Sequence, residues 1–515
     1  MKESVLALLC LCCTSAYAQG NSGDSLSIDL EMQGSYSNSK TPLWLNANKY
    51  GLSSLTASNG YMRGMATYDK AFFDDELKIQ LGADVVIPVG YKIQGYNTHY
   101  TRKFIVQQAF VEANWKYGVL TIGAKQQPME LKNNELSSGS QTLGINATPV
   151  PQVRLGLNRY WSVPYTKDWL AIKTHVAFGI MTDGSWEECA AKDSPYKYNK
   201  YTRYHQKAGY LRIGNEEKFP LSLTLGLEMA AQFGGSVYNW LGNDVRLSNN
   251  LKSYLHAFTG TGADVDEDVF ANAEGNNLGS WITRLNWNDE NIEVGAYLDH
   301  FFEDHSGMFF MDYDGYGSGS EWNERKENRY FRYDMKDALV GIDVKLKKFR
   351  YINQAVVEYV NTRYQSGPIY HDHNSTNSTH ISGRDNFYNH YTLSGWQHWG
   401  QVIGNPLYLS PIYNDDGFIG THCNRFKAWH FAFAGNPLKG LYYRAKMSWQ
   451  RGWGNYDNPY MHPKVNTSIL FETSYMFPEE SLYRHFTLHL AYGADFGKLR
   501  GNNSGIQTTI RYHIK

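Results

Sequence analysis

Apolar and polar residues alternate along the C-terminal end of the chain. One face of the segment 504–515 carries Ile506, Thr508, Ile510, Tyr512 and Ile514. The opposite face carries Gln507, Thr509, Arg511, His513 and Lys515. A period of two residues predicts a β-strand with one apolar and one polar face. The segment 484–497 alternates in the same way, so the chain is expected to end in two long strands.

Segments of this kind recur along the whole chain, about 18 in all. They are expected near 25–36, 57–71, 75–90, 102–116, 118–127, 152–161, 168–182, 200–213, 219–233, 278–288, 291–304, 332–347, 350–365, 425–434, 440–451, 465–477, 484–497 and 504–515. The pattern therefore predicts an all-β protein.

The connections between these strands alternate between short and long. Short turns are expected at 72–74, 116–117, 288–290 and 347–348, and long excursions at 128–151, 234–277, 305–331 and 366–424. Short periplasmic turns that alternate with long extracellular loops are typical of outer-membrane barrels, whereas a soluble sandwich has no reason to sort its loops in this way. We therefore expect a transmembrane antiparallel β-barrel of about 18 strands, with both ends in the periplasm.

The composition changes this interpretation little. Aromatic residues make up 15% of the chain, including 39 Tyr and 14 Trp, and 47 residues are Gly. The mean hydropathy is nevertheless negative, as expected for a barrel with aromatic girdles, an apolar outside and a wet inside. The formal net charge of -1 gives no global field that would attract nucleic acid.

The N-terminus predicts secretion. Lys2, the apolar run 5–13 and the small-residue site Ala16-Tyr17-Ala18 form a signal peptide over residues 1–18. A lipoprotein signal is the less favoured alternative. Residues 19–515 then form one barrel domain, which retains only Cys189 and Cys423. Both fall in extracellular loops, where a single disulfide is possible.

The stretch 137–161 passes from a polar loop into a strand that alternates around Arg154. In a barrel this residue is expected to point into the lumen, where a charge costs little. An ion-pair network on the lumen wall is the simplest role for it.

Candidate catalytic groups are few. The chain has no nucleophile elbow, zinc-protease motif or phosphate loop. The densest charged stretch is "DHFFEDHSGM". Its candidates for acid–base or metal chemistry are Asp299, Glu303 and Asp304 with His300 and His305. The favoured alternative is that these carboxylates line the lumen and anchor loops. The acidic loop 264–268 is expected to be solvated rather than a calcium site.

The extracellular loop 366–424 is the strongest candidate for ligand binding. Aromatic rings stack on the apolar faces of sugars, and neighbouring polar groups bind hydroxyls or acidic sugars. The candidate polysaccharide-binding residues are Arg384, Tyr388, Tyr391, Trp396 and Trp399. The alternative is that these aromatics pack on one another as a local core over the barrel mouth.

Four motifs together resemble the capsule assembly Wzi family, particularly its members from Bacteroides-type bacteria. They are "TPLWLNANKYG" (41–51), "ELSSGSQTLGINATPVPQVRLG" (135–156), "DHFFEDHSGM" (299–308) and "GQVIGNPLYLSP" (400–411). The resemblance spans nearly the whole mature chain. It implies an 18-stranded outer-membrane barrel that binds extracellular polysaccharide and helps to organise or anchor the capsule, as a lectin rather than an enzyme. One departure is that no amphipathic stretch is present for the periplasmic helical bundle of the enterobacterial members.

Three functions follow as hypotheses. The first is a polysaccharide-binding protein that assists capsule assembly at the cell surface, and the second is a porin-like diffusion or export channel for saccharides. An outer-membrane enzyme that uses Asp299, Glu303, Asp304 and His305 ranks last. We expect surface polysaccharide and outer-membrane lipid as partners, no nucleic acid, no cofactor, no metal and a monomeric state.

Overall fold

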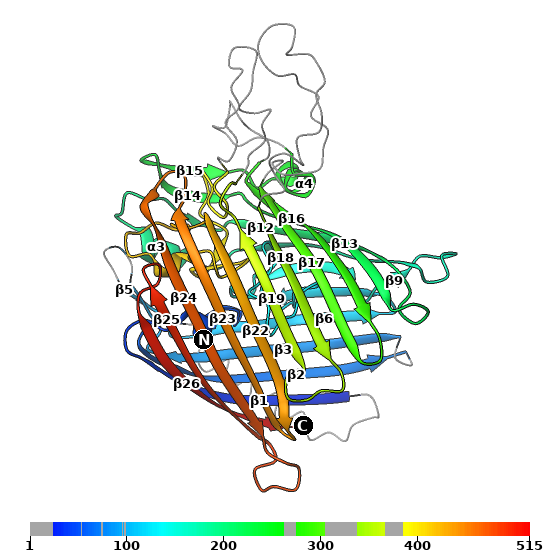
Figure 1. The fold of residues 1–515 in the computed structure, drawn as a ribbon. Coiled ribbons are helices and arrows are strands. Elements are labelled where there is room, and N and C mark those ends of the chain that lie inside the picture. Colours follow the sequence, from blue (N-terminus) through cyan, green and yellow to red (C-terminus); the bar gives the residue numbers. More distant parts are fainter. Residues whose placement is uncertain are drawn as a thin grey trace.

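The computed structural model describes residues 24–52, 54–73, 76–94, 96, 99–261, 274–303, 337–365 and 385–514. In this part of the chain one large antiparallel sheet closes on itself, because β1 pairs with β26 as well as with β2. The closing ladder runs from Ile28, opposite Ile514, to Ser37, opposite Gly505. Closure pairs the first strand of the wall with the last, so this large sheet does not end in two free edge strands (Figure 1).

The large sheet contains 19 segments. Both β8 and β9 pair with β10, so they form one interrupted strand, and the described wall has 18 strands. These are β1 (Asp24–Ser37), β2 (Ser58–Phe72), β3 (Leu77–Val89), β6 (Ile105–Trp115), β7 (Gly118–Ala124), β8 (Gln152–Leu157) with β9 (Trp161–Ser162), β10 (Leu170–Ile180), β12 (Arg203–Ile213), β13 (Leu221–Phe233), β16 (Asn276–Asn288), β17 (Ile292–Glu303), β18 (Ala338–Leu346), β19 (Gln354–Asn361), β22 (Phe426–Leu438), β23 (Leu441–Gly454), β24 (Pro459–Met476), β25 (Phe486–Gly497) and β26 (Asn503–Ile514).

Each of the 18 expected segments coincides with a wall strand, so the predicted fold is confirmed. The expected loop pattern is only partly right, because two extracellular connections are short. Strands β23 and β24 continue to residues 454 and 459, and β25 and β26 are joined through 498–502. The strands from β22 to β26 are therefore joined by short connections at both ends of the barrel.

The two faces of each strand separate lipid from lumen. In β26, Ile506, Ile510 and Ile514 are exposed on the outside, while Gln507 is buried inside and donates to the carbonyl of Leu45 at 3.1 Å. Arg511 also points inward, to Glu31 at 2.6 Å. An apolar exterior around a polar interior places this barrel in the outer membrane.

Short turns gather at one end of the barrel. Strand β1 begins and β26 ends there, beside the turn that joins β22 to β23 (Figure 1). This end is periplasmic, and the long connections lie at the extracellular end. Small sheets form at the extracellular end from β4 (Lys92–Gln94) with β5 (His99–Thr101), from β11 (Tyr198–Lys200), β14 (Gly235–Trp240) and β15 (Asn243–Leu247), and from β20 (Gln397–His398) with β21 (Gln401–Val402).

The helices are short and belong to the extracellular connections. They are α2 (Leu43–Asn46), α3 (Gly184–Ala191), α4 (Leu251–Thr259) and the 3-10 turn η3 (Pro411–Tyr413). None of the helices in the described ranges is long and apolar enough to cross a membrane.

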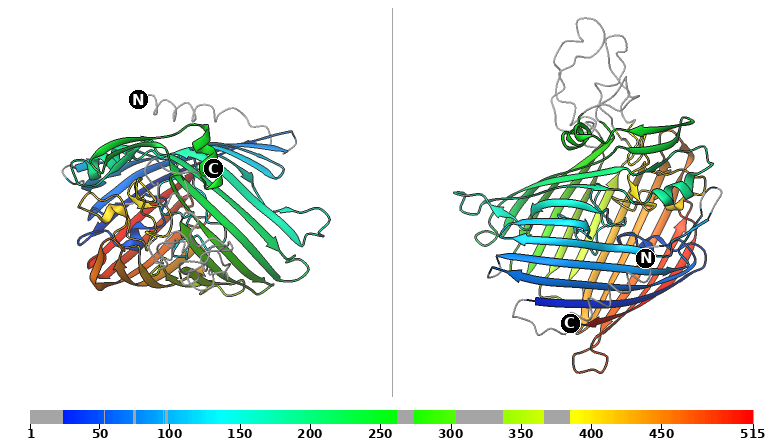
Figure 2. Two further views of the ribbon diagram at one scale, coloured as in Figure 1. Left: turned by 90° about the horizontal axis from the view of Figure 1, so that it is seen from above. Right: turned by 180° about the vertical axis from the view of Figure 1, so that it is seen from behind.

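Three extracellular segments fold back into the barrel, and we call them together the plug. They are residues 38–52 with 54–57, 125–151 and 385–424. Their apolar side chains, among them Trp44, Trp396 and Tyr408, join inward-facing wall residues in one buried core. The plug thus enters the lumen from the extracellular side (Figure 2).

The possible disulfide is absent. Cys189 lies in α3, whereas Cys423 is buried at the end of the plug, and neither forms a disulfide in the described structure.

Candidate functional site

Inward-facing carboxylates of the wall hold the plug. The best satisfied is Glu358 on β19, which accepts hydrogen bonds from Ser137 Oγ at 2.6 Å and from the backbone N–H of Ser138 at 2.8 Å. The hydroxyl of Tyr297, on β17, donates to the same carboxylate at 2.7 Å. Because Glu358 is buried, its charge depends on these three donors in place of water.

Two acids of the predicted catalytic stretch hold the plug as well. Asp299 forms an ion pair with Lys132 and accepts from the backbone N–H of Gln141 at 3.0 Å. Glu303 accepts from the backbone N–H of Tyr388 at 2.6 Å. The alternative that these carboxylates anchor loops is therefore confirmed for Asp299 and Glu303. Asp304 and His305 lie outside the described residues.

The opposite side of the wall binds the plug through other polar groups. The backbone N–H of Leu43 donates to Asp495 on β25 at 3.0 Å. Gln450 on β23 donates to the carbonyl of Leu407 at 2.7 Å, and Arg500 donates to the same carbonyl at 3.2 Å. The plug is therefore attached to distant strands around the barrel.

A polar cavity of about 420 Å³ lies between the lower end of the plug and the periplasmic half of the wall. The plug contributes its residues 130–133. The wall contributes both signs of charge, in Arg212, Arg284, Lys345, Glu216, Glu293 and Asp343. Arg284 and Asp343 form a bidentate ion pair, with N–O distances of 2.5 and 2.8 Å. Such a lining can bind hydroxyl groups and ions.

A second, smaller cavity of about 70 Å³ shares Glu130 with the first and is lined by Arg154, Gln206 and Glu228. Arg154 thus points into the lumen, as predicted. It forms no ion pair within the described part of the chain, and its Nε has no hydrogen-bond partner there. The expected ion-pair network around Arg154 is therefore wrong.

Basic side chains line the cavity side of the lumen on four strands of one part of the wall. Arg154, Lys173, Arg212 and Arg284 come from β8, β10, β12 and β16, and Lys173 pairs with Glu130 of the plug at 2.7 Å. Sequence reasoning singled out only Arg154. The other three could have been found from the alternation of each strand, because a charged residue at an inward-facing position lies in the lumen.

The five candidate polysaccharide-binding residues are separated by the fold. Arg384 lies outside the described residues. Tyr388 and Trp396 are 1% and 0% exposed. The Trp396 ring stacks on Tyr204 at 5.7 Å, and its Nε1 donates to the carbonyl of Thr142 at 3.2 Å. These two rings pack inside the plug and offer no face to a ligand. This agrees with the alternative that the aromatic residues of the loop form a local core.

Tyr391 and Trp399 lie nearer the extracellular surface. Tyr391 is 57% exposed and packs edge-on against Trp240 at 5.8 Å. Trp399 is half-buried, and the guanidinium of Arg102 lies over its ring at 4.0 Å. Trp240 and Arg102 were not expected from the sequence, because nothing in their own segments marks them as neighbours of loop 385–424.

Two buried carboxyl groups lie under the extracellular loops. Gln397 donates to Asp183 at 2.9 Å and to Glu187, in α3, at 2.8 Å. Glu187 also accepts from Ser394 Oγ at 2.7 Å. Burial, together with the charge of Asp183, raises the pKa of Glu187 well above its usual value. This pair joins α3 to the plug.

Within the described ranges no cluster of three or more His, Cys, Asp or Glu side chains is arranged to hold a metal ion. The acidic loop 264–268 lies outside those ranges.

No protein-family model matches the chain. No curated protein matches it either. Among solved structures it is similar to OccK5 (OpdH) of Pseudomonas aeruginosa, with 8% identity over 96% of this chain and 99% of that chain and a TM-score of 0.47. OprD of the same organism gives 10% identity over 97% of each chain and a TM-score of 0.44. OccAB4 of Acinetobacter baumannii gives 10% identity over 96% of this chain and all of that chain, with a TM-score of 0.45. Similarities this weak say nothing about what this chain does.

Proposed function

We propose that the protein is an outer-membrane channel for small polar solutes, saccharides among them, and that the plug narrows its extracellular half. The observation that carries this proposal is the polar cavity of about 420 Å³ beneath the plug. Its volume lies within the range of small-molecule sites. The smaller cavity at Arg154 continues it along the same wall, through Glu130.

The chemistry of the lining favours hydroxylated and charged solutes over apolar ones. Asn286 and Gln354 supply amides, Ser222 and Thr224 supply hydroxyls, and the paired charges of Arg284 and Asp343 supply fixed donors and acceptors. Sugars present both donors and acceptors, so such a wall replaces their hydration at little cost.

Solute flux into liposomes tests this proposal. Vesicles that contain the folded protein should swell in a monosaccharide and more slowly in a trisaccharide, because the plug sets the width of the path. Protein-free vesicles and vesicles with heat-unfolded protein are the controls. Swelling no faster than in these controls would contradict the channel.

A second candidate function is the attachment of capsular polysaccharide at the cell surface. It is favoured by Tyr391 with Trp240 and by Trp399 with Arg102, which place aromatic rings and a cation at the extracellular end. The resemblance of the sequence motifs to the Wzi family supports the same function. Saturable heat on titration with the capsular polysaccharide of the same strain, but not of an unrelated strain, is the expected result. No heat with folded protein would remove this candidate.

A further inference from the structure

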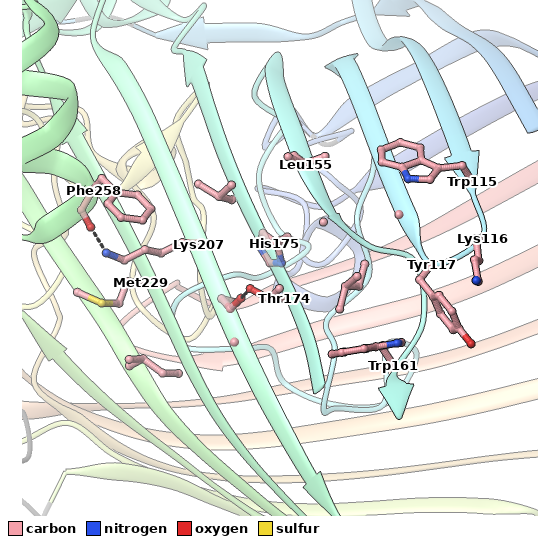
Figure 3. A pocket seen from close by; sticks show the side chains of 17 residues that line it. Trp115, Lys116, Tyr117, Leu155, Trp161, Thr174, His175, Lys207, Met229 and Phe258 are labelled. Carbon is pink, nitrogen blue, oxygen red and sulfur yellow. Dashed lines mark hydrogen bonds between the residues drawn. The ribbon is translucent and has the colours of Figure 1, made fainter. Parts of the chain in front are cut away.

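A groove crosses the outer, lipid-facing side of the barrel wall (Figure 3). It passes over β7, β8, β10, β12 and β13 and has a volume of about 850 Å³. Trp115, Tyr117 and Trp161 line its periplasmic end, and Met229 and Phe258 line its other end (Figure 3). The groove lies outside the lumen and is independent of the proposed channel.

Small residues form the floor of the groove. A Cβ atom added to Gly209 would meet nothing within 4 Å, so the space above this residue is open. Its neighbour across the ladder, Thr174, donates its hydroxyl to the carbonyl of Ala208 at 2.8 Å and leaves no unpaired donor in the floor. Leu155 and Leu227 rise on either side. A depression of this kind gives an acyl chain more apolar contact than the flat wall does.

Helix α4 closes the upper end of the groove. Its Ala257 packs against Phe233 of the wall, while Leu251, Leu255 and Phe258 stay exposed at helical spacing. The Lys207 ammonium, on β12, donates to the carbonyl of Phe258 in the last turn of α4 (Figure 3). A cation is favourable at this end of a helix, and the aliphatic part of Lys207 is left as groove wall.

Basic residues gather at the periplasmic end. Lys116 Nζ lies 5.8 Å from the centroid of the Tyr117 ring, and the Arg159 guanidinium lies 4.7 Å from it. Glu76 lines the same pocket as these two cations, but no carboxylate of the described chain lies within 4.0 Å of either of them. Indole and phenol rings beside cations suit the phosphate level of a membrane.

We propose that this groove binds one phospholipid from the inner leaflet of the outer membrane. Its phosphate lies between Lys116 and Arg159, and one acyl chain runs over Gly209 to Phe258. The position of the Lys116 and Arg159 cations indicates which leaflet supplies the lipid. They lie at the periplasmic end, whereas the ammonium at the upper end is held by α4 and is not offered to an outer-leaflet phosphate.

Native mass spectrometry of the full protein tests the proposal. The protein is stripped of lipid in detergent and then titrated with phosphatidylglycerol. The variant Gly209→Leu fills the groove, and Gly34→Leu is the matched control, because Gly34 is also exposed on the lipid side and its added Cβ meets nothing within 4 Å. We expect binding to fall about tenfold in Gly209→Leu, from the lost contact of about two methylenes, and to stay unchanged in Gly34→Leu.

A second variant tests the headgroup contacts. Lys116→Gln combined with Arg159→Gln should lower phosphatidylglycerol binding about tenfold while heat-modifiable gel migration shows an intact barrel. Equal binding by Gly209→Leu and Gly34→Leu would overturn the proposal. So would a wild-type protein that binds no phospholipid, or one that leaves the membrane with an outer-leaflet glycolipid in the groove.

Discussion

The hydroxyl of Ser137 donates to the carboxylate of Glu358 at 2.6 Å and joins the plug to wall strand β19. The two residues are 221 positions apart in the sequence. The contact is buried, so water cannot replace it if one partner is removed. The position of the plug in the lumen depends on contacts of this kind.

Replacement of Glu358 by Ala should loosen the plug. Ser137 Oγ, Ser138 N–H and Tyr297 Oη would lose their acceptor, at a cost of about 3 kcal/mol. Faster hydrogen exchange in residues 133–142 measures the effect. The control is Glu293→Ala, which removes a carboxylate from the cavity wall. Equal exchange in the two variants would mean that Glu358 does not hold the plug.

The charge pair in the cavity should set ion selectivity. Arg284→Gln is expected to shift the reversal potential in a KCl gradient toward cations, and Asp343→Asn toward anions. A unit charge about 8 Å from a passing ion in water contributes about 0.5 kcal/mol, or about twofold in the permeability ratio. Lys439→Gln changes the charge by the same amount in an exposed periplasmic turn and should have no effect. Shifts of one sign for both cavity variants would exclude this pathway.

The extracellular layer should lose stability as the pH rises. In the fold the pKa of Glu187 is raised well above 4.5 by burial and by Asp183, so the neutral acid is favoured. Its contribution is fully present below about pH 4.5 and is lost as the pH rises through the raised pKa. Hydrogen-exchange protection in α3, corrected for the intrinsic rise of amide exchange with pH, should therefore fall as the pH rises above 4.5 through the raised pKa, and Glu187→Gln should abolish this loss. Glu188→Gln, at the neighbouring half-buried position where the carboxylate pairs with Lys200, should retain it.

Two tryptophans of the same loop should behave differently. Trp396→Ala leaves a cavity in the plug core and is expected to destabilise the protein by about 3–5 kcal/mol. Trp399→Ala removes the contact with Arg102, a hydrogen bond to Thr182 Oγ1 and packing at the edge of a small cluster, at a smaller cost of about 1–2 kcal/mol. If the protein also binds capsular polysaccharide, only Trp399→Ala should weaken binding without unfolding. Thermal unfolding and calorimetry distinguish the two effects, and similar melting temperatures would contradict the assigned burial.

The strands of the wall could be predicted from the sequence because their pattern depends only on residues that are close together in the chain. Each strand separates lipid from lumen, so residues such as Ile510 and Arg511 must alternate, and the two faces can be assigned without knowledge of any partner. The short β8 shows the limit of this reasoning. The alternation continues past Leu157, but the strand is interrupted before Trp161.

The plug could not be predicted, because its contacts join segments far apart in the chain. Asn405 Nδ2 donates to the carbonyl of Gly139 at 3.0 Å, across 266 residues. Residue type also fails to distinguish Trp396, which is buried, from Tyr391, which is exposed. Both suit a sugar-binding surface and a core equally well, and only the inward path of the loop decides between them.

Single-channel recording in a planar bilayer measures whether ions pass through the barrel. We expect discrete conductance steps from folded wild-type protein, smaller than those of Glu358→Ala, in which the plug is released from β19. A silent bilayer at high load of folded protein, with Glu358→Ala equally silent, would contradict a channel beside the plug.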